Sequence, residues 1–271
     1  MISNGIGNSV DHNLLIVIIF YKNSTYFRPI LVSSLRQLLD VKGDVMRKFL
    51  TLMSLALILA QAAPASAREK MNVLVMGDSF MTSNGSNGNA VPNVLARDLG
   101  AKVKSTAVTG ARFGYKMPIT GALGFNISKQ FRDGNWDYVV MNGGGNDLWL
   151  GCGCMRCKKR LNRLISADGT TGQIPTAVRR ARQTGAQVIY VGYLRSPGLG
   201  SPIEHCKKVG AALEARIAVM AKQDVGISFV SLADMVPHGD SSFHGSDMIH
   251  PSPKGSIAAT QRIVAAIRQK P

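Results

Sequence analysis

Short apolar runs alternate with amphipathic segments along the chain from residue 73 onwards. The apolar runs are rich in β-branched residues, which is typical of buried strands in a parallel sheet. The segments between them repeat their apolar residues at helical spacing and end at glycines or polar turns. The predicted strands are 73–76, 102–107, 138–142, 187–193 and 227–231. The predicted helices are 90–99, 127–132, a segment that ends at 165, 173–184, 203–223 and 253–269.

This alternation predicts an α/β fold in which helices cover both faces of a five-stranded parallel sheet. The longest predicted helix buries Val209, Leu213, Ile217 and Met220. We expect Asn89 to cap the first helix. The pattern contains no internal repeat and indicates one domain over 68–271.

The N-terminal part of the chain has a different pattern. Residues 46–48 read Met-Arg-Lys, which is a basic start. Residues 49–60 are apolar but too few to span a membrane. Residues 65–67 read Ala-Ser-Ala, a pattern of small residues typical of a cleavage site. This order predicts a secretory signal peptide over 46–67. Residues 1–45 then precede a complete signal, either as a long targeting segment or because the start codon was assigned too early.

Cleavage after Ala67 would leave a mature chain that starts at Arg68. The mature chain is then exported, to the periplasm or the extracellular space, without a stable membrane anchor. It contains 26 of the 32 basic and 13 of the 16 acidic residues, which leaves a net charge of +13. Such a charge favours an anionic partner, such as an anionic envelope surface. No nucleic-acid-binding motif accompanies the charge, so we do not expect a nucleic-acid partner.

Export also bears on the four cysteines, which are Cys152, Cys154, Cys157 and Cys206. An even number of cysteines in an exported chain favours disulfides. A bond between Cys152 and Cys154 would close a strained ring, so we expect Cys206 to pair with one cysteine of the cluster and to join the insertion after Asn146 to the long helix. The alternative is a zinc site that uses these cysteines with His205.

Four polar stretches follow predicted strands, at the edge of a parallel sheet where ligands bind. Gly77-Asp78-Ser79 follows the first strand, and Thr109-Gly110 follows the second. Residues 143–147 (Gly-Gly-Gly-Asn-Asp) follow the third strand. The last stretch, 247–251, contains Asp247 and His250 and precedes the final helix.

Together these stretches contain what a serine nucleophile requires. Ser79 needs a base, which His250 can supply, and Asp247 can hold that base in the required tautomer. The backbone N–H groups of Ser79 and Gly110 and the side-chain amide of Asn146 can stabilise a developing oxyanion.

Other residues compete for some of these roles. His238 and His244 are rival bases, but neither has a carboxylate three residues before it. His244 could still line the substrate pocket, although we expect it to be a solvated loop residue. Asp78 is expected to hold its turn. Trp149 and Phe113 could line an acyl or sugar pocket, although aromatic residues beside strand ends more often belong to the core.

The four stretches resemble the four sequence blocks of the SGNH (GDSL-type) hydrolases. The resemblance implies a three-layer flavodoxin-like fold with sheet order 2-1-3-4-5. It implies that Ser79 is the nucleophile, that Asp247 and His250 complete the triad, and that Ser79, Gly110 and Asn146 form the oxyanion hole. Phe80 stands where the family name has Leu, and the second block lacks the Asn that usually precedes its Gly.

We therefore expect an exported serine esterase or deacylase. Its substrate would be an ester of a lipid, an acylated sugar or a cell-envelope polymer, and no cofactor or metal would be needed. The alternative is a catalytically inactive carbohydrate- or envelope-binding protein on the same fold. The complete set of Ser, Asp, His and Asn favours the enzyme.

Overall fold

The computed structural model describes residues 69–115, 121–198 and 200–270. The predicted signal peptide, its cleavage site and the segment 1–45 lie outside these residues. Within the part of the chain that the structure describes, no helix has both the length and the apolar character needed to cross a membrane.

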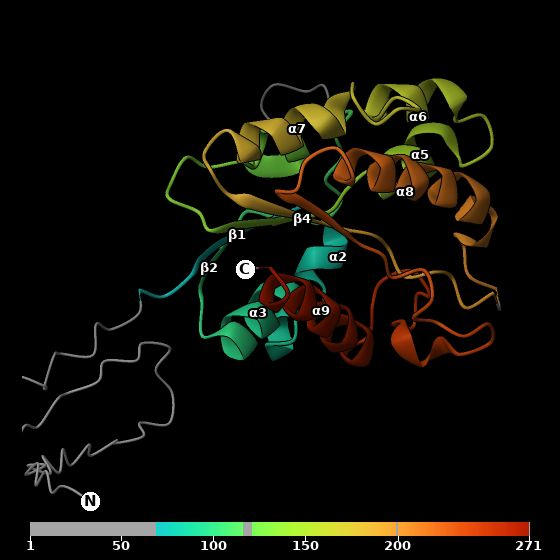
Figure 1. The fold of residues 1–271 in the computed structure, drawn as a ribbon. Helices are drawn as coiled ribbons and strands as arrows, with labels where there is room; N and C mark the ends of the chain where they lie inside the picture. Colours follow the sequence, from blue (N-terminus) through green and yellow to red (C-terminus); the bar gives the residue numbers. More distant parts are fainter. Residues whose placement is uncertain (1–68, 116–120, 199, 271) are drawn as a thin grey trace, which may run out of the picture. The chain divides into compact units, whose positions relative to one another are not determined.

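A five-stranded parallel sheet forms the centre of the fold, as predicted (Figure 1). Its strand order is β2-β1-β3-β4-β5, which is the order that the resemblance implied. Strand β1 is paired on both sides, with Val75 opposite Ser105 of β2 and Val140 of β3. The strands are β1 (Asn72–Met76), β2 (Lys102–Ser105), β3 (Tyr138–Met141), β4 (Gln187–Val191) and β5 (Ile227–Val230).

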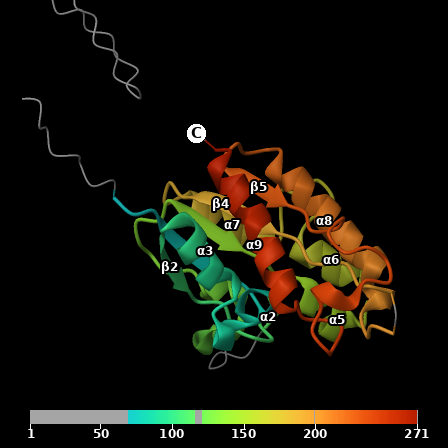
Figure 2. The ribbon, with the colours of Figure 1, turned by 90° about the horizontal axis from the view of Figure 1, so that it is seen from below.

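Helices cover both faces of this sheet (Figures 1 and 2). Val73 and Val75 of β1 belong to the core on the side of α3 and α9, whereas Leu74 and Met76 belong to the core on the opposite side. This division follows from the alternation of side chains along a strand. The helices on one face are α3 (Val91–Leu99) and α9 (Pro253–Arg268); those on the other are α5 (Gly145–Cys152), α6 (Lys158–Leu164), α7 (Gln173–Arg182) and α8 (Lys207–Ala221).

The structure differs from the prediction mainly near glycines and helix ends. Two helices were missed: α2 (Ser79–Thr82), which has only one turn, and α5, which begins within the glycine run. The segment predicted as a helix over 127–132 is a single 3-10 turn. Asn89 does not cap α3, because Ala90 is the N-cap and makes no side-chain cap. The short turns are η2 (Gly85–Asn87), η3 (Gly121–Phe125), η4 (Ile127–Lys129), η5 (Glu204–Cys206) and η6 (Ser241–Phe243).

The four cysteines form two disulfides, Cys152–Cys157 and Cys154–Cys206. The second bond joins the segment between α5 and α6 to the start of α8, as expected for Cys206. The first closes a short loop within the insertion, so only one bond staples the insertion to α8. Zinc is bound by thiolates. The alternative of a zinc site is therefore not supported, although Cys154, Cys206 and His205 lie close together.

Candidate active site

Ser79 lies three residues after the end of β1, at the first position of α2. Gly77 precedes it with φ of +143°, and a Cβ there would lie 1.8 Å from Oδ1 of Asn142. Only glycine allows this turn to pass so close to the side chain at the end of β3. The turn brings the Ser79 side chain to the edge of the sheet where the other predicted stretches also lie.

Ser79, His250 and Asp247 form a continuous chain of hydrogen bonds. Oγ of Ser79 lies 2.8 Å from Nε2 of His250, and Nδ1 of His250 lies 2.5 Å from Oδ2 of Asp247. A carboxylate on Nδ1 keeps that nitrogen protonated and leaves Nε2 as an acceptor for the serine proton. The three residues predicted to act together are thus brought together.

The backbone of the loop orients Asp247. Its second oxygen, Oδ1, accepts hydrogen bonds of 2.9 Å from the backbone N–H groups of Ile249 and His250. Partial burial raises the pKa of Asp247, but the bond from the His250 ring and the two backbone bonds outweigh it, so the pKa lies below its usual value. Asp247 is therefore a charged partner for His250 at neutral pH.

Two polar side chains from distant segments fix the loop that carries His250. The Asn84 amide donates to the backbone oxygen of Pro251 at 2.9 Å and to Oγ of Ser256 at 2.8 Å. The Ser201 hydroxyl donates to the backbone oxygen of Met248 at 2.8 Å. These hydrogen bonds from Asn84 and Ser201 fix the loop in the position that directs the His250 imidazole toward Ser79.

Beneath Ser79 lies a buried polar network that sequence analysis missed. Gln130 is fully buried, accepts from the Gly77 N–H at 2.6 Å and donates to the Gly77 oxygen at 2.8 Å. Asn142 is also fully buried; it accepts from the Asp78 N–H at 3.1 Å and donates to Oδ1 of Asp78 at 3.0 Å. These bonds satisfy the backbone of a turn that lies away from water.

Asp78 connects this network to Tyr193, another residue that the sequence did not reveal. The Tyr193 hydroxyl donates to Oδ2 of Asp78 at 2.6 Å and accepts from the Gly145 N–H at 3.2 Å. Burial and the Asp78 carboxylate raise the pKa of Tyr193 well above its usual value, so the hydroxyl keeps its proton. Tyr193 follows β4 at the same sheet edge, which is the signal that could have identified it. Asp78 itself caps α2 by accepting from the Phe80 N–H, which agrees with the expectation that it holds the turn.

The residues predicted for the oxyanion hole lie on linked segments. Gly110 has φ of +78°, and the amide of Asn146 donates to the backbone oxygen of its neighbour Ala111 at 3.2 Å. Asp147 is buried and accepts from the backbone N–H groups of Phe113 and Gly114 at 2.9 and 2.7 Å. Burial raises the pKa of Asp147 even though both bonds oppose this. Asp147 thus ties the loop of Gly110 to the helix of Asn146.

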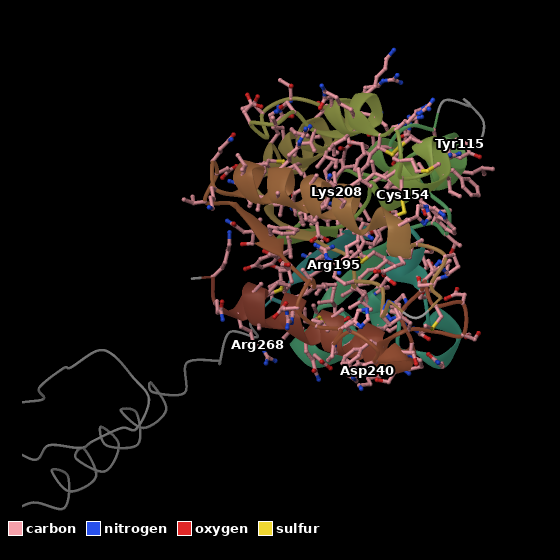
Figure 3. The ribbon with its side chains drawn as sticks, turned by 90° about the vertical axis from the view of Figure 1, so that its right-hand side faces the viewer. Tyr115, Cys154, Arg195, Lys208, Asp240 and Arg268 are labelled. Carbon is pink, nitrogen blue, oxygen red and sulfur yellow. A yellow bond between two sulfur atoms is a disulfide. The ribbon has the colours of Figure 1, made fainter. Side chains whose placement is uncertain are left out.

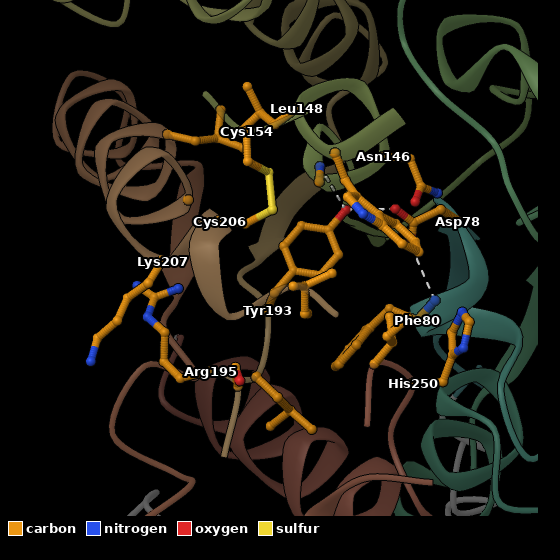
Figure 4. Close-up of a pocket in the computed structure, with 18 of the residues that line it drawn as sticks. Asp78, Phe80, Asn146, Leu148, Cys154, Tyr193, Arg195, Cys206, Lys207 and His250 are labelled. Atoms are coloured by element: carbon orange, nitrogen blue, oxygen red, sulfur yellow. Dashed lines mark hydrogen bonds between the residues drawn. A yellow bond between two sulfur atoms is a disulfide. The ribbon is translucent and has the colours of Figure 1, made fainter. Parts of the chain in front are cut away.

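A pocket opens beside Ser79 and His250 (Figure 4). Its apolar wall includes Phe80, Leu148, Trp149 and Leu213, and the Cys154–Cys206 disulfide also lines it. Trp149 therefore lies where a pocket residue was expected, whereas Phe113 is buried in the core and is not among the residues that line the pocket.

The rival histidines do not contact Ser79. His238 is exposed, and its ring packs against Gly198. His244 was expected to be solvated, and this was wrong: it is 6% exposed, because its backbone forms a bridge with Pro251 and the adjoining η6 packs against α9. Within the described residues neither ring nitrogen of His244 has a hydrogen-bond partner, and burial lowers its pKa.

We predict that Asp78→Asn changes how the stability of the protein depends on pH. Burial raises the pKa of Asp78 above its value in the unfolded chain, so the stabilising effect of its proton is present at low pH and is lost as the pH rises through the folded pKa. Asn removes this titration. The free energy of unfolding of the variant, relative to that of wild type, should therefore rise as the pH rises above about 4. Urea denaturation at several pH values measures this difference; a constant difference contradicts the prediction.

We also predict that Tyr193→Phe destabilises the protein. The change leaves the buried Asp78 carboxylate with one donor fewer and removes the acceptor of the Gly145 N–H. Loss of a buried hydrogen bond to a charged group costs about 1.5–3 kcal/mol. Urea denaturation should show a fall of this size in the free energy of unfolding. Val225→Ala, at an exposed residue, is the control, and equal stability of both variants refutes the prediction.

The parallel sheet and the Ser–His–Asp arrangement at its carboxyl edge define a class of protein, the α/β serine hydrolases. Residues 75–256, more than half of the chain, match the GDSL-like lipase/acylhydrolase family. The chain belongs to this family, and it is an enzyme of the esterase or acylhydrolase kind. The resemblance noted from the sequence is thereby confirmed.

Solved structures show the same fold. A protein from Slackia heliotrinireducens that is assigned to the SGNH hydrolases is 22% identical, with a TM-score of 0.52, over 73% of this chain and 99% of the other. A GDSL-like lipase from Bacteroides thetaiotaomicron is 18% identical, with a TM-score of 0.50, over 73% and 88% of the two chains. A carbohydrate esterase family 2 enzyme from Corynascus thermopiles (Myceliophthora fergusii) is 17% identical, with a TM-score of 0.50, over 75% and 67%. No curated protein matches the sequence significantly.

Proposed function

We propose that this protein is an exported serine esterase or deacylase that hydrolyses an ester through an acyl-enzyme on Ser79. The observation that carries the proposal is the hydrogen-bonded chain from Ser79 through His250 to Asp247 beside an open pocket. The substrates that we propose are esters of lipids, acylated sugars or cell-envelope polymers.

The mechanism follows from the positions of these groups. Nε2 of His250 takes the proton of Ser79 as Oγ attacks the ester carbonyl, and the charge of Asp247 stabilises the resulting imidazolium. The N–H groups of Ser79 and Gly110 and the amide of Asn146 are proposed to donate to the oxyanion. His250 then returns its proton to the departing alcohol. His250 then takes a proton from a water molecule, which attacks the acyl-enzyme. The acid is released and Ser79 regains its proton from His250.

A covalent label and a substrate panel test this function. A serine-directed phosphonate should add its mass to the peptide that contains Ser79 and to no other peptide. Enzyme that has not been treated with the phosphonate should hydrolyse para-nitrophenyl esters of different chain length or acetylated sugars. Labelling at another serine contradicts the role of Ser79. A protein that neither reacts nor turns over any ester, but binds glycans, would instead be the inactive binding protein.

Export is a separate part of the proposal. The predicted signal peptide supports it, and so do the two disulfides, since such bonds persist in oxidising compartments. We predict that the intact mass of protein purified from the periplasm or the medium corresponds to a chain that starts at Arg68 and carries no free thiol. A retained N-terminus, or four free thiols, would contradict this prediction.

A further inference from the structure

Two cationic side chains line the otherwise largely apolar pocket. They are Arg195, in the loop after β4, and Lys207, at the start of α8. In Figure 4 both lie on the left of the pocket and His250 lies on the right, with the Tyr193 ring between them. Figure 3 shows Arg195 on the same side of the molecule as Cys154 and Lys208. The two cations thus line the same pocket as Ser79.

The position of Arg195 is fixed by a buried carboxylate. Nη2 of Arg195 lies 2.6 Å from Oε2 of Glu214, and these side chains are only 21% and 7% exposed. The other carboxylate oxygen of Glu214 accepts from the Tyr193 N–H at 2.9 Å. An arginine held in this way loses little entropy when it binds a ligand.

The ion pair with Glu214 leaves N–H donors of Arg195 and the charge of Lys207 available to a ligand. Among the described residues, Glu214 is the only hydrogen-bond partner of Arg195, and a guanidinium carries five N–H donors. Glu214 balances one of the two positive charges, and both of its oxygens are already hydrogen-bonded. The exposed Lys207 therefore leaves the group of Arg195, Glu214 and Lys207 with a net positive charge.

We infer that Arg195 and Lys207 form a subsite for an anionic oxygen group, a carboxylate or a phosphate, carried by the ester substrate. Such groups are the partners that guanidinium and ammonium ions bind most strongly. The subsite selects esters that combine an apolar part with an anion over neutral esters of the same size. This inference rests on the proposed esterase function and specifies its substrate class.

Matched pairs of substrates test the subsite at neutral pH and low ionic strength. On the acyl side, the pair is the para-nitrophenyl monoester of glutaric acid and para-nitrophenyl valerate. On the alcohol side, para-acetoxybenzoate and para-acetoxyphenyl phosphate are each compared with para-acetoxybenzamide. We expect kcat/KM to favour an anionic member by about tenfold in one of the two sets, on whichever side of the ester the subsite lies. On the alcohol side, the comparison of the benzoate with the phenyl phosphate shows whether a carboxylate or a phosphate is preferred.

The variants Lys207→Gln and Lys208→Gln provide a matched comparison. Both residues are exposed and adjacent, and both changes remove one positive charge, but only Lys207 lines the pocket. Lys207→Gln should reduce the preference for the anion by about threefold to fivefold, while Lys208→Gln should leave it near the wild-type value. Activity on the neutral esters should not change in Lys208→Gln, whose side chain lies outside the pocket lining.

The outcomes separate this inference from the proposed function. Hydrolysis of the neutral esters without any preference for an anion overturns the subsite and leaves the esterase intact. An equal loss of preference in both lysine variants also overturns it, because the overall charge would then be the cause. If wild type hydrolyses neither neutral nor anionic esters, the proposed function itself fails.

Discussion

Ser79→Ala should lower kcat/KM for esters by about 10⁶-fold, which is the size of the loss in kcat seen when a triad serine is removed. The variant keeps the backbone N–H of Ser79 and the Asp78 cap of α2. It loses only a hydroxyl whose partner, His250, is partly exposed. We therefore expect the free energy of unfolding to stay close to that of wild type.

The matched control is Ser105→Ala, at an exposed serine that ends β2 outside the pocket. It should keep wild-type turnover, and the serine-directed phosphonate should still label Ser79 in it. The phosphonate should not label the Ser79→Ala variant. Turnover near the wild-type rate by Ser79→Ala would show that a different group attacks the ester.

His250→Ala should lower kcat/KM by a similar factor, because no other described side chain can take the proton from Oγ of Ser79 at 2.8 Å. In wild type, kcat/KM should fall on the acid side, because a protonated base can no longer accept the proton of Ser79. The low pKa of Asp247 keeps its carboxylate charged over this range, so a single group should govern the acid limb. A pH–rate profile measures it.

Three further variants test whether His250 is the residue that governs the acid side of the pH–rate profile. Asp247→Asn should cost at most about as much as His250→Ala, on the order of 10⁴-fold, because the oxyanion donors remain while the tautomer of His250 is no longer fixed. His238→Ala and His244→Ala should keep most of the rate and the same acid limb, since neither ring contacts Ser79. An acid limb that persists in an active His250→Ala enzyme, or disappears in His244→Ala, would assign the base to another residue.

The sequence by itself determined the fold class and the residues that meet at the sheet edge. Short apolar runs that are rich in β-branched residues and end at a glycine, such as 73–76, favour buried strands, and the helical segments between them favour parallel connections. Ser79, Asp247 and His250 could be selected because each follows a strand or precedes a helix at that edge, and because the spacing from Asp247 to His250 is local.

Tertiary structure alone decided the contacts that no local pattern encodes. Gln130 and Asn142 look like ordinary polar residues in sequence, yet both are buried under Ser79 because distant segments pack against the turn at Gly77. His244 is buried by contacts of its own loop with Pro251 and α9, which the local pattern does not encode either. Local periodicity carries no information on which side chains meet across such distances, and it could not place Arg195 and Lys207 in one pocket with Ser79.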